Sequence, residues 1–201
     1  DKVLVVTLTD GTTALESVVL TTRGTSITVG TPVATTLAAA GVSYEDDKLF
    51  ALGAAWVFEY VNSITASPML CAITVSGVTP TVGAELALSG YYSGPSWAVT
   101  SSVALCVRAS NSQLFAVPVS LSGTTLTAGT QATATVTNYQ GLIGGLLSTG
   151  RYAVAYTNST VFGGVINVSG TTVTISTVNL ALSAGTASER ALHVVGAQRS
   201  E

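Results

Sequence analysis

The residues that could carry acid–base or nucleophilic chemistry are few in this chain. Its 201 residues include one histidine, two cysteines and ten acidic side chains. A Ser-His-Asp hydrolase needs a histidine held between a serine and a carboxylate. The single histidine, His193, lies in a strand-like segment near the end of the sequence, and no Gly-x-Ser-x-Gly turn occurs to present a serine. We therefore expect His193 to be a strand residue on a partly exposed face, and the protein not to be an enzyme.

The acidic residues gather at one place only, the run of Glu45, Asp46 and Asp47. Glycoside hydrolysis needs two carboxylates about 5–10 Å apart across a sugar. Adjacent acids are more typical of a solvated turn that prevents strands from aggregating. Calcium binding by the three is the alternative, because hard cations prefer carboxylate and carbonyl oxygens. The spacing of an EF-hand loop is missing, so the sequence predicts no cofactor and no metal apart from this alternative site.

Aromatic side chains at two places could stack on a sugar ring. Trp56, Phe58 and Tyr60 alternate along one face of an expected strand, which is typical of a stripe in the core between packed sheets. The alternative is a sugar platform, extended by the nearby Tyr91–Trp97 segment, which we expect to be a loop on one face of the molecule. The residues predicted to bind a ligand are Tyr91, Tyr92, Trp97, Trp56 and Tyr60.

Charge and hydropathy argue against two classes of partner. The net charge is −3, and the seven basic residues are scattered singly. A nucleic-acid-binding protein needs a clustered positive surface, so we expect no nucleic acid partner. No uninterrupted run of about 18 apolar residues occurs, so we expect no membrane insertion. Cys71 and Cys106 lack a CxxC motif, which favours two buried small side chains over a disulfide or a metal site.

The elements that must position these residues come from a repeat of about 50 residues. Its most regular part is a short Gly-Thr-Thr-like segment that occurs four times: Gly24–Gly30, Gly77–Gly83, Gly123–Gly129 and Gly170–Ser176. Counted back from the first glycine of each segment, the residues two, four and six positions away are mostly apolar, and the residues one and three positions away are polar. This alternation predicts a strand with one buried face, closed by a tight turn at the glycine and followed by a second strand.

A further strand is expected before each of these hairpins, at Val3–Leu8, Leu49–Phe58, Val103–Arg108 and Tyr152–Tyr156. Each repeat is then an antiparallel meander of at least three strands. The Gly- and Ser-rich stretches Ala38–Asp47, Gly90–Ser101 and Asn138–Gly150 are candidates for a fourth strand. Pro118 stands inside an expected strand, and the missing N–H of a proline fits best at a sheet edge or a bulge.

Meanders of this kind must stack to bury both faces, which predicts an all-β fold. The repeat length favours a β-propeller-like array of about four repeats, and the alternatives are a β-solenoid or an array of β-sandwiches. We expect a single repeat body over residues 1–201, with units at about 1–37, 48–88, 101–137 and 150–182. Residues 189–201 would be a partial fifth unit or a strand that closes the ring.

The strand–turn–strand pattern with Ser-Gly-Thr-Thr-Val-Thr resembles repeats of propeller-like proteins from bacteriophages and marine bacteria, described as virion-associated, tail-fibre or adhesin-like. The best copies are Leu20–Val33, Ser120–Thr130 and Asn167–Thr177. The aromatic-Asp pair of that family is matched only by Asp10, with Asn at the other equivalent turns.

The resemblance implies a non-enzymatic structural component of a virion, associated with the tail, a fibre or a spike. Its partners would be other virion proteins, copies of itself or a glycan on the host surface. The alternative is a carbohydrate-binding propeller, a lectin or adhesin, that is secreted or held on the cell surface.

Overall fold

The computed structural model describes residues 2–8, 14–36, 42–62, 67–90, 92–110, 112–136, 141–157 and 160–183. Their regular secondary structure consists of β-strands, in agreement with the predicted all-β class. The strands are β1 Lys2–Leu8, β2 Ala14–Arg23, β3 Ser26–Val29, β4 Val33–Thr36, β5 Val42–Leu52, β6 Ala55–Asn62, β7 Ser67–Ser76, β8 Thr79–Val82, β9 Leu86–Ala87, β10 Tyr92–Ala98, β11 Val103–Ala109, β12 Gln113–Ser122, β13 Thr125–Ala128, β14 Ala132–Thr135, β15 Gly141–Ser148, β16 Arg151–Thr157, β17 Thr160–Ser169 and β18 Thr172–Ser183.

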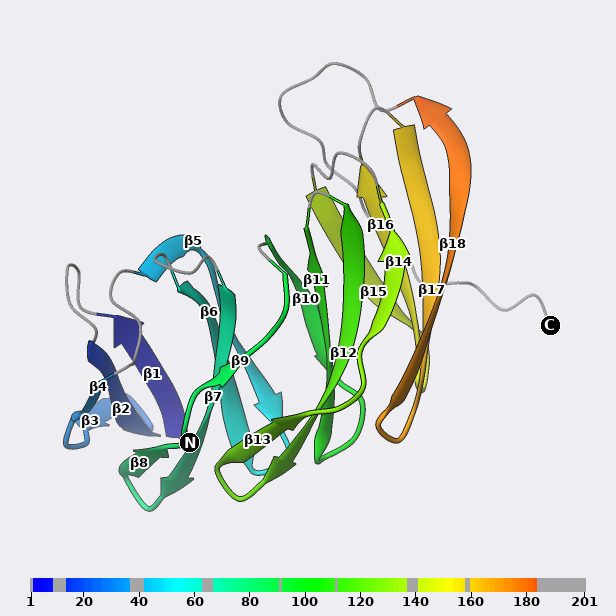
Figure 1. Cartoon of the computed structure of the whole chain (residues 1–201). Helices are drawn as coiled ribbons and strands as arrows, with labels where there is room; N and C mark the ends of the chain where they lie inside the picture. The colour runs from blue at the N-terminus through cyan, green and yellow to red at the C-terminus, as the bar shows by residue number, and fades with distance from the viewer. Residues whose placement is uncertain are drawn as a thin grey trace. The chain divides into compact units, whose positions relative to one another are not determined.

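The strands form four antiparallel sheets, which we call A to D in chain order (Figure 1). Sheet A has the order β1-β2-β3 with β4 also on β2, and sheet B has β5-β6-β7-β8 with β9 also on β7. Sheet C has β10-β11-β12-β13 with β14 also on β12, and sheet D has β15-β16-β17-β18. The predicted fourth strand is therefore present in three sheets, as β5, β10 and β15.

One predicted strand is wrong. The run Leu49–Phe58 is divided by a turn at Gly53, whose φ is +61°, so its first part ends β5 and its second part begins β6. The apolar run hides the turn, because both strands beside it are apolar and Gly53 is the single break. The other three predicted strands correspond to β1, β11 and β16.

The first glycine of each repeat segment is needed for its backbone conformation. Gly24, Gly77, Gly123 and Gly170 have φ between 59° and 62°, and each opens a two-residue hairpin turn. No atom lies within 4 Å of the position that a Cβ would take at any of the four. Only the positive φ requires glycine here, as expected for tight hairpins.

The second glycine of the segment marks a bulge that recurs in three sheets. The N–H of Gly30 donates to Val19 O, that of Gly83 to Ala72 O and that of Gly129 to Pro118 O, at 2.7–2.8 Å. One extra residue follows each glycine before the pairing resumes in β4, β9 or β14. Pro118 thus lies opposite a bulge, the position expected for a strand proline.

Sheet D differs at the same position, because Ser176 stands where the other repeats have glycine. Ser176 pairs regularly with Val165, and β18 continues through it without a break. The repeat that has serine in place of this glycine is therefore the one without the bulge at this position.

The chain divides into two compact units: Asp1–Leu88 with Leu121–Thr127, and Ser89–Ser120 with Ala128–Glu201. Each sheet has two faces, which we call even and odd. A residue that precedes the turn glycine of its sheet by an even number of positions lies on the even face, and one that precedes it by an odd number lies on the odd face. A residue on a neighbouring strand is assigned to the face of the residue with which it pairs. In the first unit, the odd face of sheet A packs on the even face of sheet B. The core contains Leu4, Leu15 and Val19 from sheet A and Phe58, Tyr60, Met69, Cys71 and Ile73 from sheet B.

The second unit follows the same rule. The odd face of sheet C, with Leu105, Val107, Leu114 and Ala116, packs on the even face of sheet D, with Tyr152, Val154, Tyr156 and Ile166. The predicted burial of the even positions is confirmed for sheets B, C and D. It is wrong for sheet A, where the odd residues Leu15 and Val19 are buried and the even face is the exposed one.

Candidate functional site

The aromatic stripe on β6 lies mainly in the core of the first unit. Tyr60 has no exposed surface and its ring stacks on that of Phe58, with centroids 5.6 Å apart and planes at 22°. Only Trp56, at the turn end of the strand, keeps 37% of its surface exposed. The interpretation as a core stripe is confirmed for Phe58 and Tyr60, and Tyr60 is not accessible to a ligand.

From Tyr92 onwards the Tyr91–Trp97 segment is a strand and not the expected loop. Tyr92–Ala98 forms β10 and pairs with β11, with an irregularity between Ser93 and Ser96. The side chains of Tyr91 and Tyr92 lie outside the described part of the structure. Gly94 and Pro95 misled the sequence interpretation, because both residues are more frequent in loops than in strands.

Trp97 is half-buried and serves the packing of sheet C on sheet D. Its ring stacks on Tyr152, with centroids 4.9 Å apart and planes at 28°. A Cβ at Gly144 would lie 2.5 Å from Cη2 of Trp97, so the ring lies directly over that glycine. Burial also raises the pKa of the Tyr152 hydroxyl. Trp97 is therefore a packing residue between sheets C and D.

The remaining candidate residues lie outside what the structure describes. They are the side chains of Glu45, Asp46 and Asp47 and the segment with His193. Within the described residues no group of three His, Cys, Asp or Glu side chains could hold a metal ion. Cys71 and Cys106 are both buried, as predicted, and no disulfide joins them. Burial raises the pKa of Cys71 from 9.0 to about 12.

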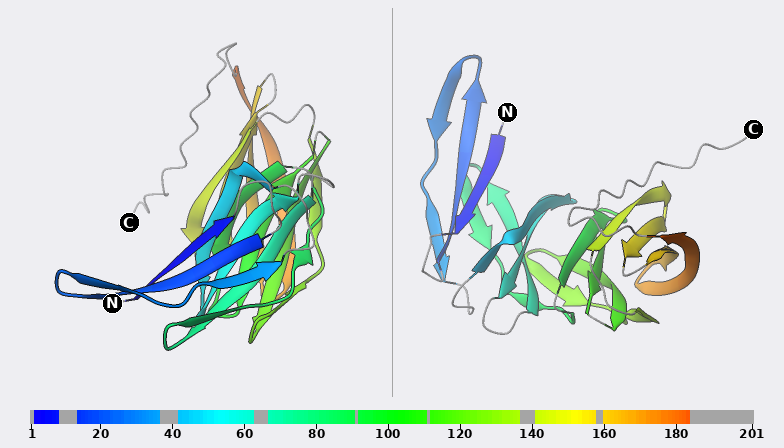
Figure 2. Two further views of the ribbon diagram at one scale, coloured as in Figure 1. Left: turned by 90° about the vertical axis from the view of Figure 1, so that its left-hand side faces the viewer. Right: turned by 90° about the horizontal axis from the view of Figure 1, so that it is seen from above.

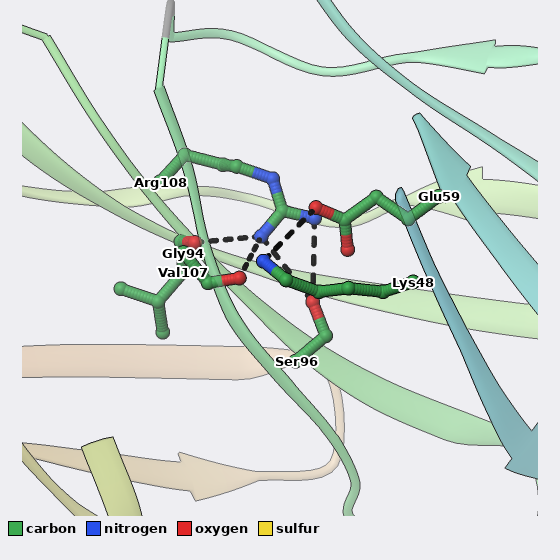
Figure 3. A network of polar contacts seen from close by, with 6 residues as sticks. All are labelled: Lys48, Glu59, Gly94, Ser96, Val107 and Arg108. Atoms are coloured by element: carbon green, nitrogen blue, oxygen red, sulfur yellow. Dashed lines mark hydrogen bonds and ion pairs between the residues drawn. The ribbon is translucent and has the colours of Figure 1, made fainter. Parts of the chain in front are cut away.

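Two charged residues that the sequence analysis overlooked are fully buried. In sheet B the Glu59 carboxylate lies 4.0 Å from Lys48 Nζ, and Glu59 has no exposed surface (Figure 3). In sheet C Arg108 donates from Nη1 to Val107 O at 2.6 Å, to Gly94 O at 3.3 Å and to Ser96 Oγ at 3.2 Å (Figure 3). Its Nη2 donates to Ser96 Oγ at 3.3 Å.

These hydrogen bonds explain how the guanidinium tolerates burial. A buried charge is costly unless it is paired or hydrogen-bonded, and the irregular part of β10 supplies acceptors. The bulge-like shift between Ser93 and Ser96 brings the Gly94 carbonyl and the Ser96 hydroxyl to Arg108. The signal in the sequence was a single charge inside an apolar run, in Leu105–Ala109 and again in Trp56–Val61.

The most unusual surface of the described residues is the even face of sheet A, which we call the sheet A face. It is formed by Val3, Val5, Val18, Leu20, Ile27 and Val29, which the strand registers place on one side. Ile27 and Val29 are 66% and 63% exposed, and they lie on the β2–β3 hairpin, which projects from its unit (Figure 2). Glu16 is the charged side chain on this face among the described residues.

Comparison of the chain with protein-family models, with curated proteins and with solved structures gives no match. In the described residues, no helix is long and apolar enough to cross a membrane. The geometry of the chain itself is therefore the basis for a functional proposal. The sheet A face is its leading candidate for a functional surface, because a contiguous exposed aliphatic cluster is unusual on a soluble protein unless it is a contact site.

Proposed function

We propose that this protein is a non-enzymatic structural component of a bacteriophage virion, associated with the tail, a fibre or a spike. The observation that carries the proposal is the sheet A face, where four of the six aliphatic residues are exposed and the other two, Val18 and Leu20, are half-buried. An aliphatic surface of this kind favours contact with another protein surface over turnover of a small polar substrate.

Composition supports an assembly role. Charged residues make up 8% of the chain, where a typical soluble domain has about 25%. Few charges leave little electrostatic repulsion between closely packed subunits. The virion context itself comes from the resemblance of the Ser-Gly-Thr-Thr repeats to propeller-like phage proteins.

The proposal also covers the arrangement of the four sheets. The shared packing rule, in which the odd face of one sheet covers the even face of the next, is the one that radially stacked blades would use. We propose that the four sheets are blades of a propeller-like scaffold whose contact surface is the sheet A face. Small-angle X-ray scattering of the purified chain tests this part of the proposal, since blades splayed as separate units would give a larger radius of gyration.

The virion proposal is tested by the protein content of phage particles. Particles produced by the host of the gene would be purified by density gradient and analysed by quantitative mass spectrometry. We expect the chain at a fixed copy number per particle, and gold-labelled antibodies against it on the tail or its appendages. Recovery only in the soluble cell fraction, with none in particles, would contradict the proposal.

A further inference from the structure

Sheet A lacks the first strand that the other three sheets have. Sheets B, C and D begin with β5, β10 and β15, and each of these strands pairs with the strand that corresponds to β1. β1 pairs with β2 along one edge, and within the described residues no strand pairs with its other edge. The free edge of β1 therefore stands at the repeat position of a missing strand.

This edge has few of the features that keep an exposed strand from pairing. β1 pairs with β2 in regular register over its whole length, without a bulge, and it contains no proline. Its one charged residue, Lys2, stands at the end of the strand, and Nζ of Lys2 donates to Gly77 O in sheet B. Natural edge strands that face water are usually short, bulged or charged. The chemistry of β1 is thus that of a strand paired on both sides.

The face of sheet B that packs on sheet A is left open on the side of its first strand. Leu49 and Trp56 on this face each keep 37% of their surface exposed, and Ala51, which pairs with Trp56, is exposed as well. Cys71 and Ile73 on the same face have no exposed surface. Sheet A therefore covers the middle of this face and leaves β5 and the neighbouring part of β6 uncovered.

The second unit shows what fills the equivalent place. Tyr152 of sheet D corresponds to Trp56, because their partners Ile166 and Ile73 both stand four residues before the turn glycine. Tyr152 is only 1% exposed, and the ring that stacks on it belongs to Trp97 of β10, the first strand of sheet C. A first strand on the covering sheet thus buries the aromatic residue that is exposed in sheet B.

The register shows which residue of an added strand would reach Trp56. Trp97 pairs with Leu105 of β11, which corresponds to Leu4 of β1, since the partners of both leucines stand five residues before the turn glycine of their sheet. A strand added to the free edge of β1 would therefore place the residue opposite Leu4 over Trp56.

We propose that the free edge of β1, together with Leu49, Ala51 and Trp56, is a strand-addition site for an extended segment of a partner protein. The segment pairs antiparallel with β1, as β10 does with β11, and presents a large apolar side chain opposite Leu4. In this mode of recognition, main-chain hydrogen bonds supply affinity and the place for the side chain supplies selectivity.

The part of this chain that follows β18 is less suited to supply the strand. A first strand follows the last strand of the preceding sheet after a short connection, so it joins the sheet that stacks next. Sheet D has Ser176 at the position where Gly30 and Gly129 receive the turn of a following sheet, so its surface does not favour one. The segment is therefore expected to come from another protein.

Hydrogen–deuterium exchange and carbene footprinting of the full chain test the site. The probe is a synthetic peptide with the sequence of residues 90–100, which contains β10 and its tryptophan. We expect it to slow amide exchange in β1 and to protect Leu49 and Trp56 from labelling. A peptide with serine in place of the tryptophan should bind about tenfold more weakly, because the stacked ring is lost.

Variants of the chain supply the second arm. Trp56→Ser should also weaken binding of the peptide about tenfold, for the same reason. The matched control Leu146→Ser, at an exposed position of sheet D, should leave binding unchanged. Circular dichroism checks that both variants keep their strands.

Four results would overturn the inference. The first two are absence of binding and binding that Trp56→Ser does not weaken. Protection of β1 and Trp56 in dilute chain without peptide would assign the place to a segment of the same chain. Protection that appears without peptide only as the concentration rises would assign it to a second copy. The inference does not depend on the virion proposal, which particle content tests separately.

Discussion

The carbonyl oxygen of Val78 lies 3.0 Å from the position that a Cβ would take at Gly30, so the turn of sheet B rests on the bulge of sheet A. The turn is held from a second side by Lys2, whose Nζ donates to Gly77 O at 2.7 Å. In the second unit, Thr171 approaches Gly129 in the same way, at 3.2 Å. In sheets A and C the two glycines of the repeat segment therefore have separate roles: the first makes a turn, and the second receives the turn of the next sheet.

Substitution of Gly30 by alanine should destabilise the first unit by about 1–3 kcal/mol, because the new methyl group meets Val19 O at 2.9 Å as well as Val78 O. Backbone oxygens cannot rotate away as a flexible side chain could. Chemical denaturation measures the loss.

The control for that experiment is Ser176→Ala at the equivalent position of sheet D. Ser176 is exposed in an uninterrupted strand, so its variant should change the free energy of unfolding by less than about 0.5 kcal/mol. Equal effects of Gly30→Ala and Ser176→Ala would show that the glycine has no special packing role.

Removal of the Ser96 hydroxyl should cost about 1–3 kcal/mol, because the buried Arg108 guanidinium then loses its bonds from Nη1 and Nη2 to Ser96 Oγ. Thermal unfolding of Ser96→Ala measures the cost. Ser102→Ala, at an exposed position beside β11, is the matched control and should be neutral. A neutral Ser96→Ala would mean that other groups satisfy the guanidinium.

A methyl group at Gly144 should displace the Trp97 ring, since the new Cβ would lie 2.5 Å from Cη2 and 2.8 Å from Cζ2. We expect Gly144→Ala to reduce the near-ultraviolet circular dichroism from the Trp97–Tyr152 stack and to destabilise the second unit by about 1–3 kcal/mol. Unchanged spectra and stability would contradict the packing role of Trp97 and restore it as a candidate for sugar stacking.

The Cys71 thiol should resist alkylation in the folded protein. Its pKa of about 12, against 9.0 when exposed, lowers the thiolate fraction at pH 8 about a thousandfold. Iodoacetamide should label Cys71 slowly under native conditions and rapidly in denaturant, with mass spectrometry of the peptide as the readout. Rapid labelling of the native protein would contradict the burial of this thiol.

The same pKa shift predicts a dependence of stability on pH. Because the folded pKa is the higher one, the contribution of the thiol to stability is complete below pH 9 and is lost as the pH rises from 9 towards 12. Wild type should therefore lose more stability than Cys71→Ala over that range. Parallel pH profiles of the two proteins would count against it.

The sequence predicted the elements well and their surroundings poorly. Alternation before Gly77, Gly123 and Gly170 identified the buried even faces of sheets B, C and D correctly. It could not reveal that sheet A presents the equivalent face to solvent, since Val18 and Leu20 are as apolar as their buried counterparts. Exposure depends on whether another sheet lies opposite, and local pattern carries no information about that.

The burial of Tyr60 and the packing of Trp97 could not be predicted for a related reason. The sequence can identify aromatic residues near Gly and Pro, but the pairing of β10 with β11 turns Trp97 towards Tyr152. Tyr60 was predicted both as a core residue and as a ligand residue, and only the fold distinguishes the two. Arg108 and Glu59 could have been noticed as charges in apolar strands, although their hydrogen-bond partners depend on the register.

Carbene footprinting of the purified chain and of the chain in phage particles tests the central claim most directly, because it reports the exposure of single side chains. Two of the described exposed apolar residues outside the sheet A face, Val78 and Leu146, provide internal controls in the same sample. We predict that Ile27, Val29, Val3 and Val5 are labelled strongly in the purified chain and are protected in particles, while the controls stay constant. Constant labelling of the sheet A face, or protection of Leu146 in its place, would contradict the account.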